Sequence, residues 1–203
     1  MRSMENRMTT KERILDSALT LFAEKGYDGV GVDLIAEKAG IKGPSLYKHF
    51  KGKEEILDTL INKVEGYYET NFGSQIHPGR IPDSMDEFID ISVKRIQFTL
   101  HDETIRKTRR ILAMEQFRNQ RIAKLATRYN LENIQGMYQK IFQGMMDAGI
   151  IRCVDPVMLS MSFVAPITLL IQMYDREPER EQEAMELMKT YLNHFAEEYG
   201  QSH

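Results

Sequence analysis

The chain has little of what marks secreted, disulfide-rich or membrane proteins. Its 203 residues include a single cysteine, Cys153, and no tryptophan. One cysteine cannot build an intrachain disulfide framework, which agrees with a reducing compartment, and we expect Cys153 to be a small buried hydrophobe. The N-terminus lacks the apolar run of a secretion signal, and we expect no segment to reach the roughly 18 apolar residues of a membrane span. These absences predict a cytoplasmic protein with no membrane partner.

The motifs of common enzymes are missing as well. The five histidines stand at 49, 77, 101, 194 and 203, without a His-Glu-x-x-His pair, a Cys and His cluster or a glycine-rich phosphate loop. Arg106, Lys107, Arg109 and Arg110 form a basic run that could bind an anion, although a solvated helix face explains it more simply. We therefore expect no catalytic residues, no metal, no cofactor and no enzymatic activity.

No stretch of the chain keeps the alternating pattern of a strand. Apolar residues recur instead at helical spacing, and 42% hydrophobic with 28% charged residues is ordinary for a globular chain. The fold class is therefore predicted to be all-α, with about nine helices.

Residues 31–53 are the most informative stretch. Leu34, Ile35 and Ala39 recur at helical spacing, and Gly40 supplies the left-handed turn that ends a helix. Pro44 then suits the first turn of a second helix, in which Leu46 and Phe50 lie one turn apart. Two short helices joined by a glycine turn are predicted over about residues 31–50.

The second of these helices presents an unusual polar face. The window from 42 to 53 contains four lysines and no acidic residue, while residues 1–60 as a whole balance ten basic against ten acidic side chains. A short helix with hydroxyls, an aromatic ring and lysines suits the major groove of DNA, with its edges on phosphates. The alternative is an ordinary solvated helical hairpin.

The flanking segments complete a small helical module. Thr9 with Glu12 forms a predicted capping box, and the helix that follows runs to Gly26. A further helix opens at Lys53 and carries an apolar stripe from Leu57 onward. We predict one domain over residues 7–67 and a second, helical domain over 68–203.

At this point the chain resembles the TetR family of bacterial transcription regulators over residues 9–64. The matching stretch reads ERILDSALTLFAEKGYDGVGVDLIAEKAGIKGPSLYKHFKGKEEIL. The resemblance implies a homodimer whose N-terminal helix-turn-helix domains bind a palindromic operator, with a C-terminal helical domain that dimerises and binds a small effector. Beyond residue 67 only helical pattern and length are similar.

The resemblance also implies roles for individual residues. Tyr47 is expected to give its hydroxyl to a phosphate and Lys53 its charge, while Ser45 and Lys48 could reach base edges. Two alternatives stay open: Tyr47 as a half-buried core residue, and His49 as a bystander. The predicted DNA-binding residues are Lys42, Gly43, Pro44, Ser45, Tyr47, Lys48, His49 and Lys53.

The last two predicted helices favour dimerisation. Residues 157–174 are apolar nearly all round, and the helix after Pro178 adds a second apolar stripe. Residues 156–175 and 178–199 of two subunits could form a four-helix interface. The alternative is burial of these helices within one subunit.

The helices of the C-terminal domain are also expected to enclose a site for a small effector. Thirteen methionines suggest an adaptable interior, and Pro166 should leave a carbonyl free within its helix. A small, largely apolar effector is expected, although methionine at helical spacing is also typical of an ordinary core. The predicted lining residues are Tyr67, Phe88, Met114, Phe117, Tyr138, Met145, Phe163 and Met173. His101, Glu115 and Gln172 are candidate polar contacts for the effector.

Together these features predict a homodimeric repressor that a small molecule releases from a palindromic DNA operator. The alternative is a DNA-bound adaptor or structural protein that recruits another protein and binds no small effector. The sequence does not identify the operator, the effector or the regulated genes, and an activator would share the same pattern.

Overall fold

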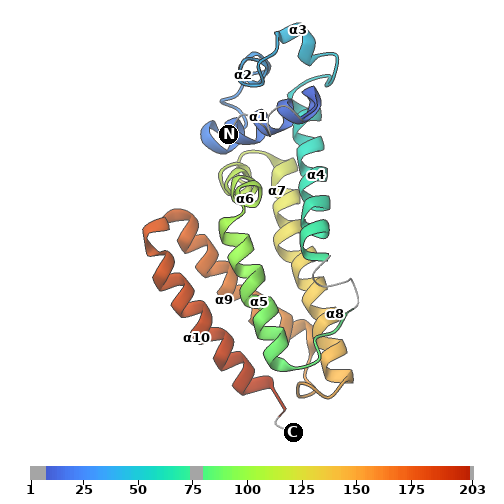
Figure 1. Cartoon of the computed structure of the whole chain (residues 1–203), viewed down its shortest axis with the longest axis vertical. Helices are drawn as coiled ribbons and strands as arrows, with labels where there is room; N and C mark the ends of the chain where they lie inside the picture. The colour runs from blue at the N-terminus through green and yellow to red at the C-terminus, as the bar shows by residue number, and fades with distance from the viewer. Residues whose placement is uncertain (1–7, 74–79, 202–203) are drawn as a thin grey trace. The chain divides into compact units, whose positions relative to one another are not determined.

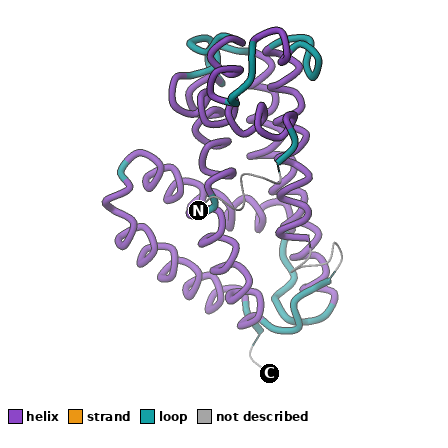
Figure 2. Tube along the Cα trace, turned by 45° about the horizontal axis from the view of Figure 1, so that its top comes forward, coloured by secondary structure: helices purple, strands orange, loops and turns teal. Residues whose placement is uncertain are grey.

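The fold is all-α, as the periodicity predicts. The computed structural model describes residues 8–73 and 80–201, of which 64, 65, 68–73, 129 and 130 are described by backbone alone. Figure 2 shows these residues as helices joined by loops, without a strand in the described ranges. If α7 to α8 counts as one continuous helix, and η3 with α10 as another, the described residues form nine helical segments.

The chain divides into two compact units. The N-terminal unit comprises residues up to Asn71 together with Glu103–Ala123, and the C-terminal unit comprises Phe72–Asp102 and Lys124–His203, within the described ranges. This division differs from the predicted boundary after residue 67, because α6 (Glu103–Glu115) packs against α1 (Thr10–Lys25). A segment distant in sequence thus completes the N-terminal unit.

The first helix of the N-terminal unit begins and ends as the sequence predicts. The Thr9 hydroxyl accepts a hydrogen bond from the backbone N–H of Glu12, whose side chain accepts one from Thr9, which confirms the capping box. Gly26 ends α1 with a φ of 75°. The helices that follow α1 along the chain are α2 (Val32–Lys38), α3 (Gly43–Leu46) and α4 (Lys53–Gly73), and α2 packs against both α1 and α3 (Figure 1).

The C-terminal unit surrounds an aromatic core. Its helices are α5 (Met85–His101), α8 (Ile134–Asp147), α9 (Pro156–Arg176) and α10 (Glu181–Tyr199), with η2 (Arg128–Asn133) before α8 and η3 (Pro178–Arg180) before α10. The helix α7 (Gln120–Thr127) spans the division between the units. Asp155 caps α9 with Pro156 in its first turn, and Gly149 ends α8 at a φ of 70°. The Phe rings of four helices meet in this core at 88, 142, 163 and 195.

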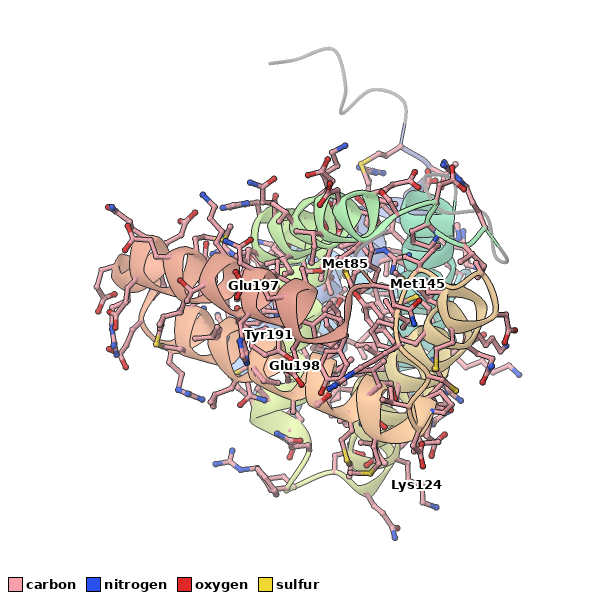
Figure 3. All side chains as sticks on the ribbon, turned by 90° about the horizontal axis from the view of Figure 1, so that it is seen from below. Met85, Lys124, Met145, Tyr191, Glu197 and Glu198 are labelled. Carbon is pink, nitrogen blue, oxygen red and sulfur yellow. The ribbon has the colours of Figure 1, made fainter. Side chains whose placement is uncertain are left out.

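Pro166 lies within α9, as predicted, and the backbone carbonyl that it leaves without a helical donor has another partner. Proline has no N–H to donate to the carbonyl four residues earlier, which is that of Ser162. The Tyr191 hydroxyl on α10 donates to the Ser162 carbonyl instead, at 2.6 Å. Figure 3 labels Tyr191 on α10 where this helix runs beside α9. The carbonyl freed by the proline therefore takes part in a hydrogen bond that joins α9 to α10.

Two expectations from the sequence need correction. Cys153 is exposed, because it lies in the irregular segment between α8 and α9 and not on a helix face. Within the described residues, α9 is long and apolar enough to cross a membrane by length and composition, with a mean hydropathy of 1.7. One face of α9 is buried in the core of the C-terminal unit through Leu159, Phe163 and Ile167. The apolar face of α9 that remains is considered below.

Candidate nucleic-acid interface

A tight glycine turn sets the direction of the second short helix. The N–H of Ile41 donates to the carbonyl of Ala36, and the N–H of Gly40 donates to that of Glu37, both at 3.0 Å. This pair of bonds, with Gly40 at a φ of 67°, is a Schellman motif. The chain therefore leaves α2 in a fixed direction and enters α3 through Lys42.

Two buried side chains anchor the segment that follows. The helix α3 is one turn long, and turns continue it through His49, whose N–H donates to the carbonyl of Leu46. Leu46 and Phe50 are both buried, one helical turn apart, as predicted. Because these two residues fix one side of the segment to the core, its other side must face outward.

The outward side carries most of the predicted DNA-binding residues. Tyr47 is 59% exposed, which excludes the alternative of a half-buried core residue. Lys42, Pro44, Lys48 and His49 are exposed as well, while Gly43 and Ser45 are intermediate. We call the outward side of residues 42–49, which excludes buried Leu46, the reading surface. The structure thus brings seven of the eight predicted residues onto one short segment.

The eighth residue, Lys53, has partners within the protein. Its ammonium donates to the carbonyl of Tyr27 at 2.8 Å and lies 4.2 Å from the centre of the Tyr27 ring. Lys53 therefore fastens the start of α4 to the turn after α1. Its expected phosphate contact stays a prediction, for which two of the three ammonium protons remain.

An acidic side chain lies beside the start of the reading surface. A Cβ atom at Gly43 would stand 3.0 Å from the Asp33 carboxylate of α2. This spacing is tight for any residue with a side chain, so a larger residue at 43 would require Asp33 to move by a few tenths of an ångström. Asp33 would repel a phosphate placed there, so phosphate contacts are favoured toward Tyr47 and Lys48.

The charge of the chain is divided between the two units. Sequence ranges 1–71 and 103–123 contain 17 Lys and Arg against 14 Asp and Glu, a formal charge of +3, and the other ranges contain 10 against 16, or −6. The segment Glu103–Ala123 supplies six of those basic residues and only two acidic ones. The basic run of α6 therefore makes the N-terminal unit positive, as a DNA-binding unit should be.

The predicted effector residues are divided between the units. Four belong to the core of the C-terminal unit, where the Phe163 ring lies 4.8 Å from that of Tyr138 and 5.1 Å from that of Phe88. Met145 is buried in the same core, and Met173 is partly buried on α9. Figure 3 shows Met145 on α8. The structure thus groups Phe88, Tyr138, Met145 and Phe163.

The other three belong to the N-terminal unit. Tyr67 is partly buried on α4, and Met114 is partly buried on α6. Phe117 follows α6 and is 90% exposed, because the chain turns there between α6 and α7. The structure therefore does not bring Phe117 together with the buried group.

Sequence reasoning does not assign a role in the N-terminal unit to Tyr27 or Glu115. From the sequence alone, Glu115 is only a candidate polar contact for an effector. Its carboxylate accepts a hydrogen bond from the N–H of Tyr27 at 3.0 Å and is buried. The spacing does indicate that Glu115 is buried, because it stands four residues after the apolar Ile111 and so lies on the apolar stripe of α6.

A helix-turn-helix with an anchored second helix and a basic outward face defines a DNA-binding protein. Comparison with known proteins identifies the family. The family described as "Bacterial regulatory proteins, tetR family" matches residues 14–60. The negative transcriptional regulator IcaR of the icaADBC biofilm operon in Staphylococcus epidermidis is 31% identical over 125 residues, covering 47% of this chain and 68% of that protein.

Solved structures share the whole fold. A putative TetR-family regulator from Mesorhizobium loti has a TM-score of 0.75 at 20% identity, covering 99% of this chain and 100% of that one. SmeT in complex with triclosan has a TM-score of 0.76 at 21% identity, covering 96% and 93%. SmeT is the repressor of the Stenotrophomonas maltophilia multidrug efflux pump SmeDEF. The chain belongs to the TetR family and is a DNA-binding transcription regulator.

Proposed function

We propose that the protein is a homodimeric, cytoplasmic repressor that binds a palindromic operator and is released from it by a small, largely apolar effector. The observation that carries the DNA-binding part is the reading surface, which Leu46 and Phe50 anchor from behind. From Lys42 to Lys53 no acidic residue interrupts it. Repression is supported by IcaR, a negative regulator. The activity proposed is regulatory and not enzymatic.

The outward apolar face of α9 and α10 supports the homodimer. Leu169 is 63% exposed, and four other large apolar residues share the outer sides of these helices. Exposed apolar residues gathered on two adjacent helices mark a protein contact surface. A second copy is the natural occupant, because a palindromic operator needs two reading surfaces about 34 Å apart. The proposed contact residues are Val157, Met158, Met161, Leu169 and Leu187.

The effector is proposed to bind in the C-terminal unit near the buried group of Phe88, Tyr138, Met145 and Phe163. The triclosan complex of SmeT supports a small aromatic or apolar ligand for this fold. An effector must bind the released state more tightly than the DNA-bound state in order to change operator affinity. In the proposed mechanism it shifts α4 and moves the two reading surfaces out of register.

One observation favours the alternative of an adaptor without a small effector. The ring centres of Phe88, Tyr138, Phe142 and Phe163 lie 4.8–6.4 Å apart, so the four rings are in direct contact with one another. A ligand that enters among them must displace packed rings. An adaptor would use the exposed face of α9 and α10 for a different protein.

Selection of DNA from a random duplex pool tests the proposal. We expect the wild-type chain to enrich a palindrome and to bind it as two subunits, measured by sedimentation of the complex. Small apolar compounds are then screened for release of that duplex. Enrichment of no sequence would contradict the repressor, while a bound palindrome with no compound that releases it would favour the adaptor.

A further inference from the structure

The turn between α1 and α2 is held from two sides through one residue. Tyr27 receives Lys53 of α4 at its carbonyl and presents its N–H to Glu115, the last residue of α6. Its ring also packs on Phe22 of α1, with the ring centres 5.2 Å apart. The C-terminal end of α6 and the first residue of α4 are therefore joined through the backbone of a single residue.

Burial of the Glu115 carboxylate costs more free energy of hydration than its one hydrogen bond returns. Glu115 is 3% exposed, and its Oε2 atom accepts no hydrogen bond from the described residues. A buried carboxylate with one partner loses most of its hydration, so simple stabilisation does not explain it. A directional contact that fixes the position of the turn does explain it.

The backbone of the turn is shaped around this carboxylate. A Cβ atom at Gly26 would lie 2.7 Å from Glu115 Oε1, closer than side chains tolerate. Gly26 also adopts a φ of 75°, which suits glycine. Both features place the peptide between Gly26 and Tyr27 directly against the carboxylate.

The joined elements lead to the reading surface. Four residues separate the end of α2 from the start of α3, and Lys53 begins α4 four residues after His49. A shift of Tyr27 relative to α6 therefore acts on both segments that hold residues 42–49. We propose that Glu115 is a positioning residue for DNA recognition, which fixes the reading surface relative to α6 through Tyr27 and Lys53. This inference rests on the proposed function as a DNA-binding regulator.

Hydrogen exchange of the unliganded protein gives the first test. Glu115→Ala removes the acceptor, and we expect exchange of the Tyr27 amide, and of the Ile56 amide that donates to the Gly52 carbonyl at the start of α4, to accelerate by about tenfold or more. Glu115→Gln keeps a carbonyl oxygen for Tyr27 and should restore protection. Thr20→Val is the matched control, because it removes the Lys107 to Thr20 hydrogen bond of 2.9 Å between α6 and α1 without touching Tyr27. Unchanged exchange in Glu115→Ala, or equal acceleration in Thr20→Val, would overturn the proposal.

DNA binding gives the second test. Its readout is the ratio of the affinities for two duplexes, which loss of stability alone does not change. Affinity is measured for a duplex selected by the wild-type chain and for a scrambled duplex of equal length. We expect Glu115→Ala to weaken the selected duplex on the order of tenfold and the scrambled duplex much less, because misplaced reading surfaces lose base contacts first. Glu115→Gln should bind both like the wild type.

The outcomes separate the two proposals. Equal weakening on both duplexes, or none on either, would overturn the positioning role while the regulator stands. If the wild-type chain selects no sequence, the proposed function fails, and hydrogen exchange still decides whether Glu115 holds the turn.

Discussion

The hydrogen bond between Tyr191 and the Ser162 carbonyl allows a quantitative prediction. The hydroxyl of Tyr191 replaces the donor that Pro166 lacks, so Tyr191→Phe leaves this carbonyl without its protein partner. Ser162 is exposed, so water compensates in part, and we expect a net loss of about 1 kcal/mol. In a chain of this length about 1 kcal/mol lowers Tm by about 2–4 °C. Urea unfolding at a fixed protein concentration measures the loss.

A double-mutant cycle tests the stated cause. Pro166→Ala restores a backbone N–H that can donate to the Ser162 carbonyl within α9. Tyr191→Phe should then cost less, by at least about 0.5 kcal/mol, than it does beside the proline. Tyr199→Phe on the same helix is the control, since its hydroxyl has no hydrogen bond among the described residues. An equal cost of Tyr191→Phe in both backgrounds would refute the reasoning.

The same tyrosine predicts a pH dependence. Burial raises the pKa of Tyr191 from 10.0 to about 12, and the neighbouring Tyr199 adds to the shift. The folded state therefore holds the proton more tightly than the unfolded state. Its contribution to stability is complete below pH 10 and is lost as the pH rises from 10 to about 12. Tyr191→Phe should flatten the fall in stability over this range.

Three further predictions concern the dimer, the charge and the turns. Leu169→Arg should turn a dimer into a monomer in sedimentation experiments and weaken operator binding; a dimer that persists would place the interface elsewhere. Replacing Arg106 and Arg110 with Gln should slow association with DNA at low salt, with the difference vanishing at high salt, and equal rates would mean that α6 does not steer DNA. Gly26→Ala should lower Tm more than Gly40→Ala, because both distort a positive φ but only the first collides with a carboxylate; equal decreases measured by calorimetry would contradict this.

The local architecture of the N-terminal unit could be predicted from the sequence. The capping box, the glycine turn and the burial of Leu46 and Phe50 depend on neighbours within a few residues, so residue types and spacing suffice. The exposure of Tyr47 follows from the same pattern, because its neighbours at 46 and 50 fix the buried side.

Contacts between distant segments could not be predicted in this way. The packing of α6 on α1 joins segments far apart in the sequence, and the hydrogen bond from Tyr27 to Glu115 spans 88 residues. Likewise, the sequence indicates that Pro166 frees a carbonyl but not that Tyr191 meets it. From the sequence, Lys53 is expected to contact a phosphate. Its hydrogen bond to the Tyr27 carbonyl could not be predicted, because it depends on the turn after α1 lying beside the start of α4.

The most direct test of the central claim is a fluorescence titration of the protein with its selected duplex across a salt series. Tyr47→Ala and Lys48→Gln are measured beside the wild type, with Lys189→Gln on α10 as a control that also removes one exposed lysine. We predict tight, salt-dependent binding that both reading-surface variants weaken, and a salt slope that is shallower by about 0.9 for each phosphate that a variant no longer neutralises. Equal affinities and equal slopes for all four proteins would show that residues 42–49 do not bind the DNA.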